Sequence, residues 1–240
     1  MNRSKSEELD EIAVGYDPSD PTQFFDYWFK RCEAEALQPW LRGVRVLELG
    51  GATGESASLI APQCSEYVIV EGSPVNCDII KKRLPTVDVI EGYWEEYEPS
   101  AKFSDIILFE TLEHYSQPVS LLTRCRGWLS PGGRIFVSVP NGNSLHRQVA
   151  VRMGLQSTAL EVNANDASQG HLRNYSREAL EQDILSAGLK VIHSQGLYLK
   201  LVPNAMMLGW NEQLLRAIND LGASRIDDAA ELFFVCEAAD

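Results

Sequence analysis

Short apolar runs alternate with helix-like segments through the middle of the chain. Five runs have the composition of strands: VRVLEL at 44–49, YVIVE at 67–71, VDVIE at 87–91, DIILFE at 105–110 and RIFVSV at 134–139. Helical patterns separate the first three runs and the last two, as in the segment after Ser73, which has Pro74 at its first helical position, whereas the link from 91 to 105 is polar without a clear helix signal. Apolar strands that alternate with helices indicate a parallel sheet with both faces covered.

The two ends of the chain break this rhythm. Residues 20–41 predict a helix, with Asp20 as its N-cap and an apolar stripe made by Phe24, Phe25, Trp28, Phe29 and Cys32. We expect this stripe to pack, although a helix placed before the first strand could also roof a site. Residues 141–172 are polar, with a short helix at 144–153, which is typical of a lid or binding loop. A helix capped by Ser176, a strand at 189–202, a helix at 205–222 and a last strand at 230–238 complete the pattern.

Charge and cysteine content narrow the choice of partners. The net charge is −13, and the longest basic cluster, Lys81-Lys82-Arg83, matches the last turn of a helix, so a nucleic-acid partner is not expected. The five cysteines are widely and irregularly spaced, which fits neither a zinc site nor a disulfide framework. Since the N-terminus is polar and no apolar run approaches the length of a membrane span, we expect a reduced, cytoplasmic protein.

The stretch VLELGGATG, residues 46–54, ends the first predicted strand in a turn of small residues. Gly50, Gly51 and Gly54 allow the main chain to approach a ligand closely, and the helix that follows offers free N–H groups to an anionic group. A dinucleotide fingerprint would place its second glycine at Ala52. The spacing found is instead Glu48-x-Gly50-x-x-x-Gly54.

That spacing resembles the first motif of class I S-adenosylmethionine-dependent methyltransferases. LFETLEH at 108–114 and LSPGGRIFVSVPN at 129–141 resemble the small-molecule group that includes the O-methyltransferases of ubiquinone biosynthesis, and residues 170–195 resemble it more faintly. The resemblance implies a Rossmann-like, seven-stranded, mostly parallel sheet with helices on both faces and an antiparallel last strand. It also implies one domain over residues 1–240, with a helical cap at 1–40 and a substrate-side lid at 141–175 between strands five and six.

The resemblance further implies a site for S-adenosylmethionine, which leaves as S-adenosylhomocysteine. Glu71, at the end of the second strand, lies where the family places the carboxylate that accepts both ribose hydroxyls. Tyr93 stands at a commonly acidic position beside the adenine, so Trp94 or backbone groups would make that contact. The implied cofactor-binding residues are Glu48, Gly50, Gly51, Ala52, Gly54, Glu71, Gly72, Ser73, Tyr93, Trp94, Glu110 and Thr111.

Methyl transfer is an in-line displacement, so the protein has to align the reactants and, for some acceptors, remove a proton. His171 is the first candidate for a base or substrate anchor, and a loop histidine that bonds backbone is an equal alternative. His114 could act similarly or could orient its loop. His146, Arg173, Tyr175 and Asn141 are candidate substrate-binding residues, and no metal is expected.

The leading hypothesis is methyl transfer to an oxygen or nitrogen of a small natural-product, sugar or quinone-like molecule. If the acceptor is an amine, Glu110 or Glu113 could orient its ammonium form. Two alternatives stay open, namely a non-catalytic cofactor-binding partner subunit and an NAD-dependent oxidoreductase or epimerase. A homodimer stays open as well.

Overall fold

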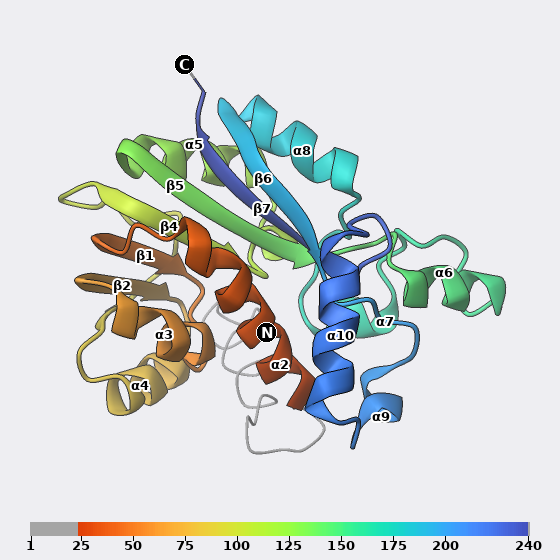
Figure 1. Ribbon diagram of the computed structural model, residues 1–240. Coiled ribbons are helices and arrows are strands. Elements are labelled where there is room, and N and C mark those ends of the chain that lie inside the picture. The colour runs from red at the N-terminus through yellow and green to blue at the C-terminus, as the bar shows by residue number, and fades with distance from the viewer. Residues whose placement is uncertain (1–23, 240) are drawn as a thin grey trace, which may run out of the picture.

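A seven-stranded sheet forms the centre of the molecule in the computed structural model, which describes residues 24–239 (Figure 1). Its spatial order is β3-β2-β1-β4-β5-β7-β6. The last strand in the chain, β7, is antiparallel to both of its neighbours, and the other pairs are parallel, which confirms the predicted mostly parallel sheet. The strands are β1 (Arg45–Leu49), β2 (Glu66–Glu71), β3 (Asp88–Glu91), β4 (Phe103–Phe109), β5 (Leu129–Pro140), β6 (Leu189–Leu197) and β7 (Glu231–Ala238).

The strand order reverses between β1 and β4. The chain moves outward from β1 to β3 and then returns, so that β4 pairs with the other side of β1 through Val46↔Asp105 and Leu47↔Ile106. In open parallel sheets, ligands bind outside the carboxyl ends of the strands at such a reversal. The loops that follow Leu49 and Phe109 are therefore the place to look for a site.

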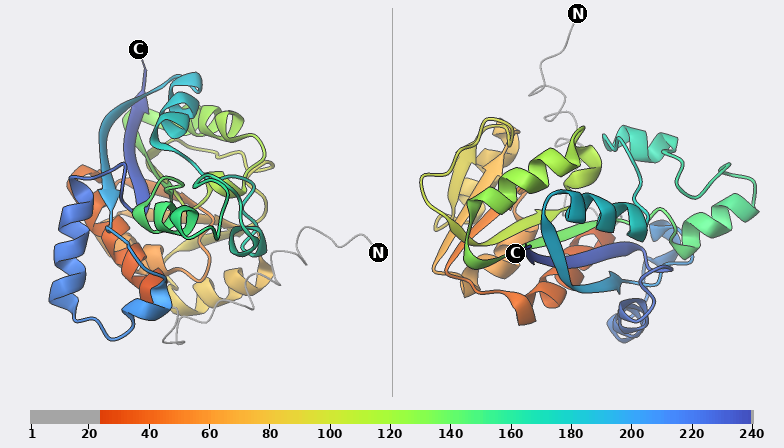
Figure 2. Two further views of the ribbon diagram at one scale, coloured as in Figure 1. Left: turned by 90° about the vertical axis from the view of Figure 1, so that its right-hand side faces the viewer. Right: turned by 90° about the horizontal axis from the view of Figure 1, so that it is seen from above.

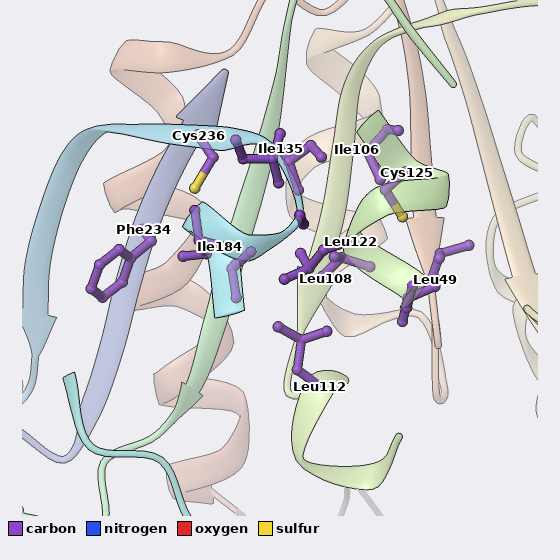
Figure 3. Packing of buried hydrophobic residues seen from close by; sticks show 14 of the residues in the cluster. Leu49, Ile106, Leu108, Leu112, Leu122, Cys125, Ile135, Ile184, Phe234 and Cys236 are labelled. Carbon is purple, nitrogen blue, oxygen red and sulfur yellow. The ribbon is translucent and has the colours of Figure 1, made fainter. Parts of the chain in front are cut away.

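Helices cover both faces of the sheet because β4 is apolar on both sides. Ile106 and Leu108 pack towards α5 (Pro118–Trp128) and α8 (Arg177–Ser186), as Figure 3 shows from close by. Ile107 and Phe109 lie in the cluster on the opposite face. That face is covered by α2 (Phe24–Leu37), α3 (Glu55–Ile60) and α4 (Pro74–Arg83), and the two layers are visible in Figures 1 and 2.

The N-terminal half of α2 leaves the sheet and packs against the C-terminal part of the chain. Phe25, Trp28, Phe29 and Cys32 form a cluster with Tyr198, in which the rings of Phe29 and Tyr198 meet edge to face at 5.5 Å. The predicted role of the stripe in packing is confirmed for these residues, while the side chain of Phe24 and residues 1–23 of the predicted cap lie outside the described part. The remaining helices of this region are α6 (Leu145–Arg152), α7 (Ala164–Ser168), α9 (Asn204–Met207) and α10 (Glu212–Ala223).

Several predicted boundaries were wrong, each for a local backbone reason. The helix predicted at 205–222 is interrupted between α9 and α10, where Gly209 adopts a φ of 82°. The strand predicted to reach residue 202 ends at Leu197, because Tyr198 turns the chain at a φ of 57°. The N-terminal helix ends at Leu37, and the 3-10 turn η2 (Gln38–Trp40), which contains a proline, follows it.

All five cysteines are free thiols, as the spacing predicted. Within residues 24–239, no helix is both long and apolar enough to cross a membrane.

Candidate functional site

The loop after β1 is shaped by residues that a side chain would obstruct. Gly50 and Gly54 have φ angles of 81° and 85°, in the region where L-residues are strained, and Ala52 is held at 44°. A Cβ on Gly51 would lie 2.5 Å from Cγ2 of Ile69 on the neighbouring strand. The main chain of this loop therefore lies across the ends of β1 and β2 without bulky side chains, so a ligand can approach the backbone closely.

The helix that follows this loop has an acidic residue of the chain itself in its first turn, and its N-cap residue, Gly54, makes no side-chain cap hydrogen bond. Glu55 begins α3, is buried, and accepts hydrogen bonds from Thr53 and from Arg83 of α4. The chain thus places its own carboxylate at the positive end of this short helix. Anion binding at this helix terminus stays a prediction, and Glu55, directly after Gly54, is a competing negative charge in the first turn.

Glu71 connects the first loop with the second. Its carboxylate accepts hydrogen bonds from the backbone N–H of Ala52 at 3.1 Å and of Ser73 at 2.8 Å. It is 6% exposed, and burial raises its pKa although these hydrogen bonds act in the opposite direction. Ser73 is the N-cap of α4, with its hydroxyl accepting from the N–H of Asn76, so Gly72 lies between two anchored residues.

An aromatic wall stands beside the glycine loop. Cζ2 of Trp94 would lie 3.1 Å from a Cβ on Gly50, and the ring of Trp94 is 6.0 Å from that of Tyr115. Trp94 is half-buried and also packs against the core on this face. Tyr93 is half-buried next to it, and the adenine contact of either side chain stays a prediction.

Glu48 lies on the other side of the sheet from this wall. It is 2% exposed and accepts a hydrogen bond from the Tyr67 hydroxyl at 2.9 Å. Burial raises its pKa to about 7. Its side chain is thus paired within the layer between the sheet and α2, and its contact with a cofactor stays a prediction.

The end of β4 is tied to both β1 and α2. The hydroxyl of Thr111 donates to the carbonyl of Leu49 at 3.0 Å, which joins the two predicted cofactor loops. Glu110 is held at a φ of 49° and forms an ion pair with Lys30 of α2, whose ammonium also lies 3.1 Å from Glu33. Burial acts to raise the pKa of Glu110, but the charge and hydrogen bond of Lys30 hold it below the usual value.

Glu33 and Glu231 complete an acidic layer around Lys30 with Glu110. Glu33 is fully buried and accepts a hydrogen bond from the hydroxyl of Ser138, and Glu231 is 4% exposed. Burial raises the pKa of Glu33 to about 7 and that of Glu231 well above its usual range. Among the described residues, three carboxyl groups thus share the charge of one lysine.

A histidine pair lies next to this layer. His114 belongs to the 3-10 turn η4 (Leu112–His114), and its ring meets that of His171 edge to face at 4.8 Å. Burial lowers the pKa of His114 to about 4, and burial also lowers the pKa of His171. Both rings are therefore neutral near pH 7 and have a nitrogen that can accept a proton.

Glu113 stands behind the two histidines. It is 1% exposed, and neither of its carboxyl oxygens has a hydrogen-bond partner among residues 24–239. Its Oε1 lies 3.9 Å from Nε2 of His114, and one ligand atom from each of Glu113, His114 and His171 lies within 4.8 Å of the others. This donor set could hold a metal ion, so the expected absence of a metal stays a prediction.

The predicted lid folds around an ion pair that the sequence analysis missed. Arg147 of α6 donates to both carboxylate oxygens of Asp166 at 3.2 and 3.0 Å, and the carbonyl of Asp166 accepts from the N–H of His171 at 3.0 Å. The N–H of Leu172 then donates to the carbonyl of Glu113 at 2.8 Å. The capping box formed by Asn163 and Asp166 was the local sequence feature that could have indicated an ordered turn at this position.

Three other predicted substrate residues have hydrogen-bond partners within the chain. Tyr175 is 3% exposed and donates to Asp183, and Arg173 donates to the carbonyl of Ser116 at 3.2 Å, so their contacts with a substrate stay predictions. The amide of Asn141 donates to the carbonyls of residues 226, 227 and 229. His146 is half-buried, with burial lowering its pKa to about 3, and its contact with a substrate stays a prediction.

The chain is similar to a known protein family and to named proteins. Residues 13–194 match the methyltransferase domain family. A *Mycolicibacterium smegmatis* protein named a probable S-adenosylmethionine-dependent methyltransferase is 30% identical over 119 residues, which are 48% of this chain and 46% of that protein. A ubiquinone biosynthesis O-methyltransferase of *Cereibacter sphaeroides* is 28% identical over 106 residues, 42% of this chain and 43% of that protein. The chain thus matches less than half the length of these relatives.

Solved structures share the whole fold at low identity. A *Thermotoga maritima* protein, described as a SAM-dependent methyltransferase and possible histamine N-methyltransferase, superposes with a TM-score of 0.67 at 19% identity over 97% of this chain and 98% of that one. The N-methyltransferase NodS of *Bradyrhizobium japonicum*, solved with S-adenosylhomocysteine, gives a TM-score of 0.60 at 13% identity, with 98% of each chain covered.

Proposed function

The chain belongs to the methyltransferase domain family, and on that premise we propose that it transfers the methyl group of S-adenosylmethionine to an oxygen or nitrogen of a small-molecule acceptor. The cofactor supplies an activated methyl group when it is bound. The loop at Gly50–Gly54 and the carboxylate of Glu71 would hold its adenosyl part, beside the wall formed by Trp94.

The observation that supports catalysis most directly is the histidine pair at the end of β4. The two neutral rings lie at the carboxyl edge of the sheet, after the strand that pairs with β1, where the fold brings ligands. His171 has a buried Nδ1 without a hydrogen-bond partner in the part of the chain that the structure describes, and it is the proposed base or acceptor anchor. Proton transfer by a positioned side chain of this kind contributes about 100- to 10,000-fold to a rate.

A His171→Ala variant tests the role of the base. We expect its turnover to fall about 100-fold or more, with the affinity for S-adenosylhomocysteine, measured by calorimetry, within about twofold of the parent. His193→Ala, in β6, is the matched control, because that ring stacks on Trp40 at 4.9 Å and hydrogen-bonds Gln195. Equal losses of turnover and cofactor affinity in His171→Ala would contradict the assignment.

The non-catalytic partner and the NAD-dependent enzyme make different predictions in the same calorimeter. The partner subunit would bind S-adenosylhomocysteine without any turnover, and the NAD-dependent enzyme would bind NAD in place of the thioether. Turnover is also measured in the presence of EDTA. If EDTA abolishes turnover and added metal restores it, the two histidines are metal ligands and not bases.

A further inference from the structure

We propose that the acceptor is a primary or secondary amine, which binds as an ammonium ion to Glu113 beside His114 and His171. This inference deepens the proposed function and rests on it, since it names the acceptor class of the same site. Glu113 would anchor the acceptor and would take no part in the bond changes of methyl transfer.

Glu113 has the features of half of a hydrogen-bonded pair. Its carboxyl group is 1% exposed, and neither oxygen receives a hydrogen bond from the described part of the chain, although buried polar groups normally have a partner. Its backbone is fixed, because the N–H of Leu172 donates to its carbonyl at 2.8 Å. This contact joins the backbone of η4 to the lid, and an incoming donor would satisfy the two carboxyl oxygens of the side chain.

The surrounding charges select a cationic donor. Glu33, Glu110 and Glu231 form the acidic layer next to Glu113, and all three interact with the ammonium of Lys30. This layer already holds one ammonium group, since Lys30 pairs with Glu110 and lies 3.1 Å from Glu33. Burial raises the pKa values of Glu33, Glu113 and Glu231, and a second ammonium would favour their ionised form and donate to both orphan oxygens of Glu113. A hydroxyl group donates only one hydrogen bond, and an anionic acceptor would oppose this ionisation.

The histidines complete the chemistry that an amine requires. The ammonium nitrogen first gives a proton to a neutral imidazole nitrogen of His171 or His114, which frees its lone pair. That lone pair forms the N–C bond to the methyl carbon while the C–S bond breaks, and the C–S electron pair remains on sulfur as the thioether of S-adenosylhomocysteine. The sulfonium charge thus passes to the methylated nitrogen, which becomes an ammonium ion, the proton removed earlier stays on the imidazole, and no other reactant is needed.

The test uses the full chain with S-adenosylmethionine and matched acceptor pairs. Each pair contains an amine and the corresponding alcohol or phenol, such as 2-phenylethylamine with 2-phenylethanol, tyramine with its deaminated phenol, and aminosugars with the parent sugars. Release of S-adenosylhomocysteine is measured for each member. We expect the amine of at least one pair to have a kcat/KM about tenfold or more above that of its partner.

Two variants connect this preference to Glu113. Glu113→Gln is expected to raise KM for the amine about tenfold or more, with a smaller change in kcat and unchanged binding of S-adenosylhomocysteine. Glu96→Gln, an exposed carboxylate after β3, is the control and should leave all three quantities unchanged. If Glu113→Gln has lost folded structure by circular dichroism, Glu113→Asp replaces it, and a raised KM is again the expected result.

Three results would overturn the amine assignment. They are faster methylation of the hydroxyl members, methylation of hydroxyl members but of no amine in the panel, and tight binding of Zn²⁺ or Mg²⁺ alone that disappears in Glu113→Gln. Failure of the proposed function looks different, because the parent protein would then not bind S-adenosylhomocysteine or would show no turnover with either member of any pair.

Discussion

Glu71 provides the sharpest test of the cofactor site, because its carboxylate has a structural role and a proposed ligand at once. One oxygen accepts from the N–H of Ser73 and the other from the N–H of Ala52. Removing the whole group would leave both amides without an acceptor and would disturb the loop. Glu71→Gln is the better perturbation, because the amide keeps one oxygen in place and removes the charge and one acceptor.

The magnitude has two parts. Without cofactor, one backbone N–H loses its partner, which costs about 1 kcal/mol, or about 2–4 °C in Tm for a chain of this length. With cofactor, one ribose hydroxyl would lose a hydrogen bond to a charged group, worth about 1.5–3 kcal/mol. The Kd for S-adenosylhomocysteine should therefore rise about 10- to 100-fold.

Isothermal titration calorimetry with S-adenosylhomocysteine measures the second part, and thermal unfolding of the free protein measures the first. Glu66→Gln is the matched control, because it makes the same change at the opposite end of β2, where the side chain is 65% exposed and pairs with Arg45. A Kd that changes less than about threefold in a folded Glu71→Gln protein would remove Glu71 from the binding site.

Three further outcomes are expected. The pKa of Glu48 is raised to about 7 in the folded protein against about 4.5 in the unfolded chain, so its contribution to stability is complete below pH 4.5 and is lost as the pH rises through 7. Glu48→Gln should therefore flatten the pH dependence of the unfolding free energy measured in urea, and an unchanged pH dependence would argue against this burial effect. Gly51→Ala should weaken S-adenosylhomocysteine binding and lower Tm, because its Cβ meets Ile69 at 2.5 Å, and parental affinity would show that the loop can relax. Asp166→Asn should cost about 3 kcal/mol of unfolding free energy by leaving the buried Arg147 without its carboxylate, and hydrogen exchange should rise first in residues 141–175, whereas uniform exchange would refute a local role.

The amino-acid pattern alone was sufficient to predict the sheet and the glycine loop after β1. Apolar runs such as 105–110 admit little besides a strand buried on both faces, and the residues of β4 do divide between two core clusters. The glycines at 50 and 54 mark backbone angles that other residues avoid, and those angles are found. These features are local, since each depends on spacing and backbone preference within about ten residues.

The tertiary structure decided what surrounds that loop. The sequence did not indicate that Glu48 accepts a hydrogen bond from Tyr67 or that Glu55 pairs with Arg83, and the fold brings both pairs together. It also assembled the acidic layer from α2, the end of β4 and the start of β7, which are far apart along the chain. The sequence alone does not show whether a carboxyl group will face water or another acid. Its pKa depends on burial and on neighbouring charges, and only the folded chain determines these.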